Sequence, residues 1–415
     1  MAVPKLRFPE FTDDWEQRKL SQIYSTIRNA FVGTATPYYV DDGHFYLESN
    51  NVKDGQINHN TEVFINDEFY KKQKGKWLHT GDLVMVQSGH VGHTAVIPPE
   101  LDNTAAHALI MFQHPKQEIE PYFLNYELQT LSAKKKIADI TTGNTIKHIL
   151  ASEMQEFVMD LPSILEQRRI AAFFRQIDNT ITLHQRKLED LRILKKSMLQ
   201  KMFPSEGNSV PEVRFPEFTA AWEQRKLGSI SEIKTGPFGS TLHADDYVTD
   251  GIPIITTEHF KNGDLPTSKN GLPQVSDEDY KRLSSYVLNE GDIVFSRVGS
   301  VDINALVMPS QRHWLFSGRV LRVRPDMVND PQFLHTVLET ETIKADIRSR
   351  AVGQTMPSIN TEILNETLVM MPQLRAEQEQ IGQFFYSLNK TITLHQRKCD
   401  DLQKLKKALL QQMFC

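Results

Sequence analysis

Apolar side chains recur at every third or fourth position over two long stretches of the chain. The first seam runs through Ile181, His184, Leu188, Leu191, Lys195, Met198 and Met202, and the second through Ile392, His395, Cys399, Leu402, Lys406, Leu409 and Met413. Such heptad spacing is typical of helices that pack along one face. It predicts long helices over 164–204 and 373–415, each with an apolar stripe that Leu194 and Leu405 widen.

A helix of this length with one apolar face needs a partner, and the other predicted helix is the obvious one. Four seam positions are polar: His184, Lys195, His395 and Lys406. Two interpretations of them stay open. They either fix the register of the two helices at some cost in stability, or they lie at the solvated margin of the seam.

The segments before each long helix alternate short strand-like and helix-like runs. GHFYLES, GDLVMVQS and ALIMFQ in the first half are answered by GIPIITT, GDIVFSR and RVLRVRP in the second. Turn pairs such as Asp54-Gly55 and Gly291-Asp292 separate them. Helix-like runs follow, PYFLNYELQTLSAKKKIAD and PQFLHTVLETETIKADIRS. The pattern predicts one mixed α/β (α+β) domain in each half.

The sequence is an internal tandem duplication. PKLRFPEFTDDWEQRKL begins at Pro4 and PEVRFPEFTAAWEQRKL at Pro211, while TITLHQRK begins at Thr180 and again at Thr391. The offsets are 207 and 211 positions, so each copy fills about half of the 415 residues. The middles, 21–160 and 231–370, are far less alike. A duplication that keeps its ends and changes its middles suggests two equivalent sites for one partner beside two different readers.

The repeats divide the chain into four parts. They are a mixed domain over 1–163 with a repeated leading segment over 4–20, a helix over 164–204, a second mixed domain over 205–372 with its leading segment over 211–227, and a helix over 373–415. Tandem copies that pack on each other tend to adopt pseudo-two-fold symmetry. We therefore expect antiparallel long helices that form a coiled coil, with the mixed domains held apart at its ends.

Charge is distributed unevenly along the chain, whose formal net charge is −5. Residues 21–163 hold 11 Lys and Arg against 17 Asp and Glu, and residues 231–372 hold 13 against 19. The predicted helices are basic, with 9 against 4 over 164–204 and 7 against 4 over 375–415. A lone DNA-binding protein is usually basic overall, because phosphate contacts supply most non-specific affinity. If this chain binds DNA, a partner supplies much of the grip.

Several classes of protein are disfavoured. The chain lacks an apolar run of about 18 residues and an apolar leader, so no membrane contact and a cytoplasmic location are expected. Cys399 and Cys415 are too few for a disulfide framework or a cysteine zinc site. GxxxxGK[ST], GxGxxG, GxSxG and HExxH motifs are missing. His90 and His93 form an HxxH without an obvious third ligand, so neither a metal nor a cofactor is expected, and the chain is predicted to bind rather than catalyse.

These features together resemble the specificity subunit of Type I restriction–modification systems, over essentially the whole chain. The resemblance rests on the duplicated LRFPEF…WEQRKL segment, on GDIVFSRVGS, on TTGNTIKHI and AVGQTMPSI, on EQRRIAAFF and EQEQIGQFF, and on the paired TITLHQRK helices. No single motif is diagnostic, but their order and duplication are specific.

The resemblance implies two target-recognition domains, each reading one half of a bipartite site in double-stranded DNA. The coiled coil would set the non-specific spacer and dock two modification subunits, methyltransferases that carry S-adenosylmethionine and methylate adenine at N6. Two restriction subunits that use ATP and Mg can join the assembly and cleave distant DNA. This chain would bind no cofactor and would not itself be an enzyme. Because the two middles differ, the half-sites should differ.

Candidate DNA contacts are polar residues in loops beside the predicted strands. In the first domain they are Asn50, Asn51, Lys53, Gln87, Ser88, His90, His93, Asn144, Thr145, Lys147 and His148. In the second they are Lys234, His259, Lys261, Arg297, Ser300, Arg319, Arg348, Arg350, Gln354, Thr355 and Ser358, with Arg322 and Arg324 as further phosphate contacts. Loop closure, helix capping, turn chemistry and solvated charge are the structural alternatives.

Other basic residues are less telling. The run Lys134-Lys135-Lys136 is more typical of a solvated helix face, and Lys195 and Lys196 could touch phosphates, contact a partner or stay solvated. Three rival functions also stay open: a coiled-coil scaffold with two protein-binding domains, a decoy or inactive specificity subunit, and an enzyme with an unrecognised site.

Overall fold

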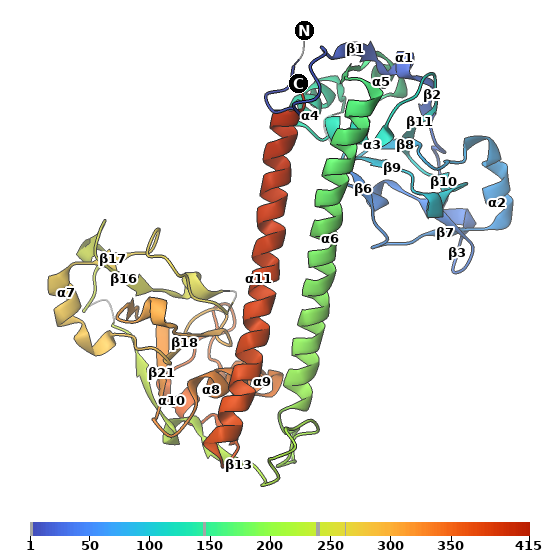
Figure 1. The fold of residues 1–415 in the computed structure, drawn as a ribbon. Helices are drawn as coiled ribbons and strands as arrows, with labels where there is room; N and C mark the ends of the chain where they lie inside the picture. Colours follow the sequence, from blue (N-terminus) through green and yellow to red (C-terminus); the bar gives the residue numbers. More distant parts are fainter. Residues whose placement is uncertain (1–2, 144–146, 238–240, 262) are drawn as a thin grey trace. The chain divides into compact units, whose positions relative to one another are not determined.

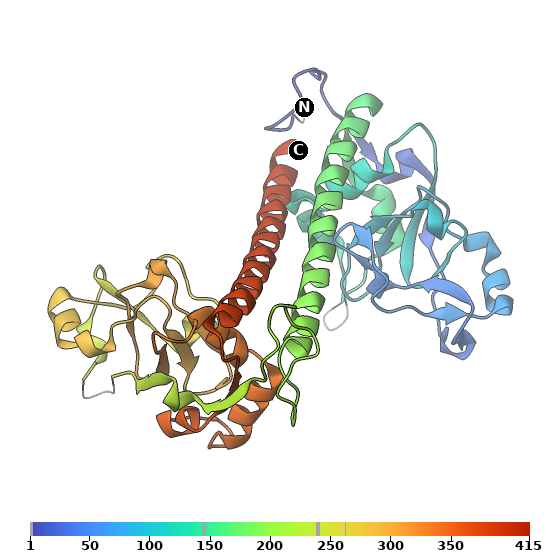
Figure 2. The ribbon, with the colours of Figure 1, turned by 60° about the horizontal axis from the view of Figure 1, so that its bottom comes forward.

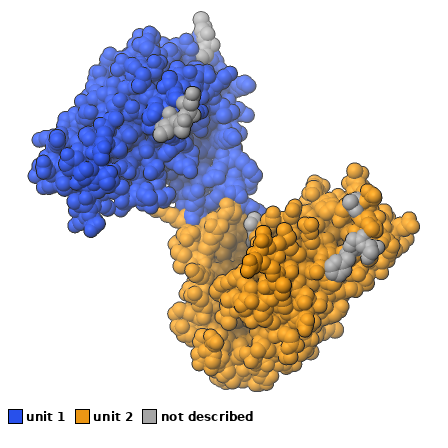
Figure 3. All heavy atoms as spheres, turned by 180° about the vertical axis from the view of Figure 1, so that it is seen from behind, with its two compact units in different colours: residues 1–185, 397–415 blue, residues 186–396 orange. Residues whose placement is uncertain are grey.

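The computed structural model describes residues 3–143, 147–237, 241–261 and 263–415. The chain divides into two compact units (Figure 3): unit 1 is residues 1–185 with 397–415, and unit 2 is residues 186–396. The division falls inside both long helices, α6 (Ile164–Lys201) and α11 (Arg375–Met413). Each unit therefore consists of one mixed domain and a part of each long helix.

Unit 1 contains two four-stranded sheets and a short hairpin (Figure 1). The antiparallel sheet has the order β2 (Tyr24–Asn29), β11 (Leu109–Pro115), β8 (Leu83–Val86), β9 (Thr94–Val96). The mixed sheet has the order β10 (Ala105–Ala106), β4 (His44–Leu47), β7 (Phe64–Ile65), β3 (Tyr39–Val40), with β10 parallel to β4. The hairpin pairs β5 (Val52–Lys53) with β6 (Gln56–Ile57). The helices are α1 (Leu20–Ile23), α2 (Asp67–Lys72), α3 (Pro121–Glu127), α4 (Leu131–Ile140) and α5 (Ala151–Glu156).

Unit 2 repeats this plan. Its antiparallel sheet has the order β14 (Ser231–Thr235), β21 (Val320–Pro325), β18 (Ile293–Ser296), β19 (Asn304–Leu306). Its mixed sheet has the order β15 (Tyr247–Val248), β17 (Gln274–Val275), β16 (Ile252–Ile255), β20 (Leu315–Phe316), with β20 parallel to β16. The helices are α7 (Asp277–Arg282), α8 (Pro331–Leu338), α9 (Glu341–Arg350) and α10 (Thr361–Asn365). The predicted mixed domains with paired long helices are confirmed.

The repeated leading segments fold alike in the two units. Strand β1 (Glu16–Lys19) pairs antiparallel with β12 (Val158–Leu161), and β13 (Glu223–Lys226) pairs with β22 (Leu368–Met371). Arg7 donates two hydrogen bonds to Glu166 at 2.7 and 2.8 Å, and Arg214 donates the same two bonds to Glu377 at the same distances. Bidentate pairs of this kind fix orientation as well as adding energy. They attach each leading segment to the first turn of a long helix.

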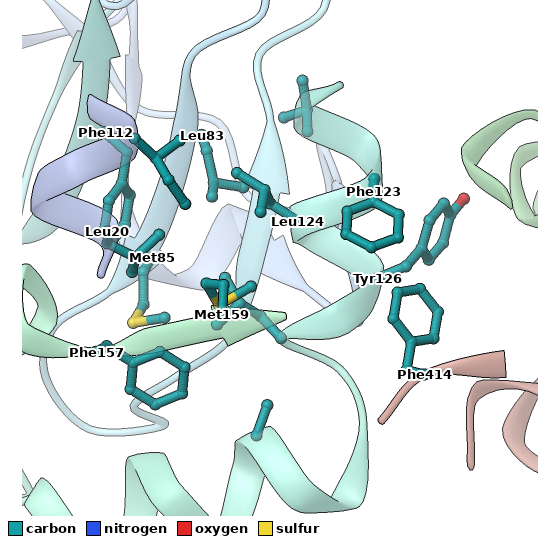
Figure 4. Close-up of a cluster of buried hydrophobic side chains, with 14 of the residues drawn as sticks. Leu20, Leu83, Met85, Phe112, Phe123, Leu124, Tyr126, Phe157, Met159 and Phe414 are labelled. Atoms are coloured by element: carbon teal, nitrogen blue, oxygen red, sulfur yellow. The ribbon is translucent and has the colours of Figure 1, made fainter. Parts of the chain in front are cut away.

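The core of each unit is completed by the end of a long helix from the other copy. In unit 1, Phe414 packs against Phe123, with ring centroids 5.2 Å apart (Figure 4). The ring centroid of Phe174 lies 5.9 Å from that of Phe414. In unit 2, Phe203 lies 5.9 Å from both Trp222 and Phe333. The N-terminal part of one long helix thus lies beside the C-terminal part of the other within each unit (Figure 2), so the helices run antiparallel there.

The structure places the seam residues on the covered side of the long helices. Six of them are buried: Ile181, Leu188, Leu191, Met202, Cys399 and Met413. Eight are partly buried: His184, Lys195, Met198, Ile392, His395, Leu402, Lys406 and Leu409. Leu194 and Leu405 do not widen the stripe as predicted, since their exposed fractions are 41% and 49%. The covered face is therefore narrower than the residue types suggested.

Candidate nucleic-acid interface

Two of the predicted loops of unit 1 lie directly against each other. Ser88 and His148 form an isolated antiparallel bridge. The Gly89 N–H donates to the Lys147 carbonyl at 3.0 Å, and the Ile149 N–H donates to the Gln87 carbonyl at 3.0 Å. The loop after β8 and the loop after α4 thus form one surface. Lys147, His148 and His90 are exposed on these loops; Asn144 and Thr145 lie outside the described residues.

A third loop, which carries Asn50 and Lys53, joins this surface. His90 Nε2 donates to the Ser49 carbonyl at 3.1 Å, and the Asp54 N–H donates to His93 Nδ1 at 3.2 Å. Burial lowers the pKa of His93, so this ring is a neutral acceptor at pH 7. Asn50 and Lys53 are exposed. Three loops that are far apart in sequence therefore converge in unit 1.

Asn51 has a structural role in this loop. Its side chain is 1% exposed, its Oδ1 accepts from the Glu48 N–H at 3.0 Å, and its Nδ2 donates to the Thr61 carbonyl at 2.8 Å. His259 occupies the same position in unit 2, where its Nδ1 accepts from the Thr256 N–H at 3.1 Å. Both side chains therefore stabilise the same turn. Asn51 is too buried to reach DNA, whereas a DNA contact of His259 stays a prediction.

The loops of unit 2 converge on the same backbone frame. Val298 and Ser358 form an isolated bridge, and the Gly299 N–H donates to the Pro357 carbonyl at 2.8 Å. The Ile359 N–H donates to the Arg297 carbonyl at 2.9 Å. Gly299 has a φ of +84°, close to the +81° of Gly89, a left-handed conformation that glycine adopts without strain. The two units thus build this loop pair in the same way.

The exposed side chains on this frame differ from those of unit 1. Arg319 joins the surface because the Arg297 N–H donates to its carbonyl at 2.9 Å. The Arg297 guanidinium donates to the Gly318 carbonyl at 3.0 Å. Ser300, Gln354 and Thr355 are exposed, and Ser358 is partly buried. Unit 2 therefore presents arginine, amide and hydroxyl groups where unit 1 presents histidine, lysine and amide groups.

Three other candidates of unit 2 hold the domain together. Arg348 pairs with Asp302 at 2.6 Å and with Glu341. Arg350 pairs with Asp346 and donates to Thr367 at 2.6 Å. Lys234 donates to the Ser285 carbonyl at 3.0 Å and lies over the Tyr286 ring. Each of these side chains therefore has partners within its own domain, and a contact with DNA stays a prediction for all three.

The phosphate contacts expected for two strand arginines are also corrected. Arg322 is 2% exposed and lies 2.6 Å from Glu232, and burial lowers the pKa of its guanidinium. Arg324 is held by Asp292 through two hydrogen bonds of 2.7 Å. Residue type alone could not separate these arginines from Arg297, because the difference lies in their surroundings: Arg322 and Arg324 pair with carboxylates, whereas Arg297 lies in the loop after β18.

The described part of the chain offers no metal centre. In residues 3–143, 147–237, 241–261 and 263–415, no three His, Cys, Asp or Glu side chains are grouped so that they could hold a metal ion. Over the same residues, no helix has the length and apolar character needed to cross a bilayer. The fold and the two loop surfaces define a binding protein with two unlike polar surfaces on a duplicated frame.

Comparison with known proteins identifies the family. The family model for the Type I restriction modification DNA specificity domain matches residues 12–192 and again residues 220–404. The chain therefore belongs to this family, as a specificity subunit, the non-catalytic component of Type I restriction–modification complexes.

Relatives and solved structures agree along nearly the whole chain. The Type I restriction enzyme MjaVIII specificity subunit of Methanocaldococcus jannaschii is 21% identical, over 98% of this chain and 92% of the relative. The EcoBI specificity subunit of Escherichia coli is 22% identical, over 80% and 73%. The crystal structure of the S subunit from M. genitalium has a TM-score of 0.69 and 14% identity, and it covers 100% of this chain and 99% of that one. At this identity the structural likeness concerns the fold.

Proposed function

We propose that each unit reads one half of an asymmetric, bipartite site in double-stranded DNA. The observation that carries the proposal is the pair of loop surfaces, which share a backbone frame but present different side chains. Arginine suits guanine edges in the major groove, and amide groups suit adenine. The cluster of Arg297, Arg319 and Gln354 and the cluster of Gln87, His90 and His148 therefore select different bases.

The long helices, in this proposal, set the spacer between the half-sites and dock two modification subunits. Four exposed leucines support duplicated docking. Leu183 and Leu394 occupy matched positions with exposed fractions of 67% and 54%, and Leu194 and Leu405 are a second matched pair. An apolar side chain that is exposed at the same place in both copies is a candidate contact for one partner bound twice.

The chemistry of the assembly would lie outside this chain. Members of the family typically bind no cofactor. The modification subunits would hold S-adenosylmethionine and methylate adenine at N6 after base flipping, and restriction subunits would use ATP and Mg for cleavage. This chain would position those subunits over the two half-sites.

The first test is a methylome of the source cell with this gene intact and deleted. We expect deletion to remove N6-methyladenine at one gapped, asymmetric motif, which would also supply the target. An unchanged methylome together with failure to co-purify with two methyltransferases would contradict the proposal and favour a scaffold. Co-purification without methylation would indicate an inactive or decoy subunit.

The spacer role has a separate test. The boundary between the units falls after Gln185 and after Gln396, which are matched positions of the two copies. Inserting one heptad at both places lengthens the helices by about 10 Å, the rise of roughly three base pairs. We expect a motif with unchanged half-sites and a spacer about three base pairs longer. Changed half-sites with an unchanged spacer would contradict the role.

A further inference from the structure

Unit 1 contains a groove where the mixed domain meets the long helices. The groove has a volume of about 580 Å³. Its basic and amide lining comes from the β5–β6 hairpin, α4, α6 and α11, and includes Lys53, Lys134, Gln185, Gln403, Lys406 and Lys407. Lysines from three separate elements thus face one space in a unit whose mixed domain is acidic overall.

One of the two acidic residues that line the groove is already paired. Asp178 lies 2.6 Å from Lys406 and accepts a hydrogen bond from Tyr126 at 2.7 Å. Asp54 lies 3.8 Å from Nδ1 of His93, but that ring is neutral and does not offset the carboxylate, which three lysines outnumber. Lys53, Lys134 and Lys407 are exposed and leave the groove with a positive surplus. The groove therefore favours an anionic ligand.

The groove continues the proposed base-reading surface. Lys53 and Asp54 belong to the loop whose backbone hydrogen-bonds to His93, and His90 donates to Ser49 in the same loop. A duplex seated on the reading loops would bring its backbone toward this hairpin. Lysine and amide side chains are the usual contacts to phosphate and sugar, which fix position without reading sequence.

All three lysines have counterparts in unit 2, and two of them lie within the middles, which are otherwise far less alike. Lys261 matches Lys53 in FKNG and VKDG, and Lys344 matches Lys134 in TIKAD and SAKKK. Lys196 matches Lys407 in the repeated helices. In two domains that differ in their reading loops, matched lysines indicate a contact that both need regardless of sequence.

We propose that Lys53, Lys134 and Lys407, with their counterparts Lys261, Lys344 and Lys196, are contacts to the DNA phosphate backbone that act independently of base sequence. The inference rests on the proposed function, since it assigns a second role within the same DNA-binding surface. In this proposal, each unit has loops that read bases, whose side chains differ between the units, and three lysines that contact phosphate, which are the same in both.

The test uses the full chain bound to its modification subunits. Binding of K53Q/K134Q/K407Q to the cognate duplex and to poly(dI-dC) is measured from about 50 to 200 mM salt. We expect affinity for both DNAs to fall at least tenfold, and the salt slope to become shallower by about 2 to 3 because each lost phosphate contact changes it by about 0.9. The ratio of cognate to non-cognate affinity should change less than about threefold.

A matched variant controls for charge. K72Q/K74Q/K135Q removes three exposed lysines of the same unit that do not line the groove, and it should keep the wild-type slope to within about 1. Equal slopes for the two variants would overturn the proposal, as would a loss confined to cognate DNA. Loss of the modification subunits with DNA contacts intact would instead assign the groove to a protein. If the wild-type complex prefers no duplex at all, the proposed function itself fails.

Discussion

Lys406 and Lys195 occupy the same position in the two copies of the long helix, but their charges are balanced from different places. In unit 1, Lys406 pairs at 2.6 Å with Asp178, which belongs to the other long helix. In unit 2, Lys195 pairs at 3.0 Å with Glu339, which follows α8 in the recognition domain. The counterparts of the two acids are neutral: Asn389 matches Asp178, and Gln129 matches Glu339.

The comparison shows that each recognition domain matches the charges of the long helices against which it packs. Burial opposes the charge of Glu339, but His335 and Lys195 outweigh it and lower the pKa of Glu339. If the second recognition domain replaced the first in unit 1, the carboxylates of Glu339 and Asp178 would both face Lys406. The reverse exchange would leave Lys195 without its acid. Near-identical helices thus do not make the two domains freely interchangeable.

The largest expected effect tests what the units share. Phe414→Ala and Phe203→Ala each remove a buried ring that completes a core, and large-to-small core changes of this kind cost about 3 to 5 kcal/mol. We expect each variant to increase amide hydrogen exchange in one unit only, unit 1 for Phe414 and unit 2 for Phe203. Equal loosening of both units by either change would show that the cores are not separately completed.

The second-largest expected effect is a pH dependence of stability that only unit 1 should show. Burial raises the pKa of Glu127 to about 8, and its position in unit 2 is taken by Val337. From the ordinary value of 4.5 up to about 8, folded unit 1 holds a proton that the unfolded chain releases, so its stability falls as pH rises through this range.

Glu127→Gln cannot ionise and should remove that slope. We expect it to stabilise unit 1 by roughly 2 to 4 kcal/mol near pH 8 and by almost nothing at pH 4.5. Denaturant unfolding across pH measures the difference, and Val337→Ala is a control that should add no pH dependence. A gain that is constant with pH would contradict the assignment.

The lysine pairs test the difference between the units directly. Asp178→Asn should destabilise unit 1 by roughly 2 to 3 kcal/mol, since it leaves Lys406 largely buried without its acid. Glu339→Gln should do the same in unit 2, and adding Asn389→Asp should recover more than half by moving the acid to the helix, as in unit 1. Thermal unfolding of the three variants beside the wild type measures this, and no recovery would show that the pairing geometry is particular to each unit.

The smallest expected effect is on the discrimination between base pairs in one half-site. Arg297→Ala should cost about 1 to 3 kcal/mol of discrimination at one base pair of one half-site and leave the other half-site unchanged. Binding to a set of duplexes mutated one position at a time would show it, with Arg348→Ala as a matched arginine control that keeps wild-type discrimination. Equal relaxation at both half-sites would contradict separate reading by the two units.

The sequence determined the duplicated plan, the mixed domains, the long helices and the loops that would read DNA. Heptad spacing and repeated motifs report local structure directly, so these features could be predicted. The sequence could not show that Asn51, Arg322 and Arg350 are paired within their domains. A residue type states which hydrogen bonds a side chain can make, but not whether its partner is the protein or solvent.

The tertiary structure alone decided which polar groups are exposed and which residues meet across long separations. That Phe414 completes the core of unit 1 depends on a contact with Phe123 nearly 300 residues earlier. That Lys406 and Lys195 are balanced by acids from different elements depends on how each domain lies against its helices. Burial and charge pairing are properties of the assembled unit, and a one-dimensional pattern carries only the residues that are able to take part.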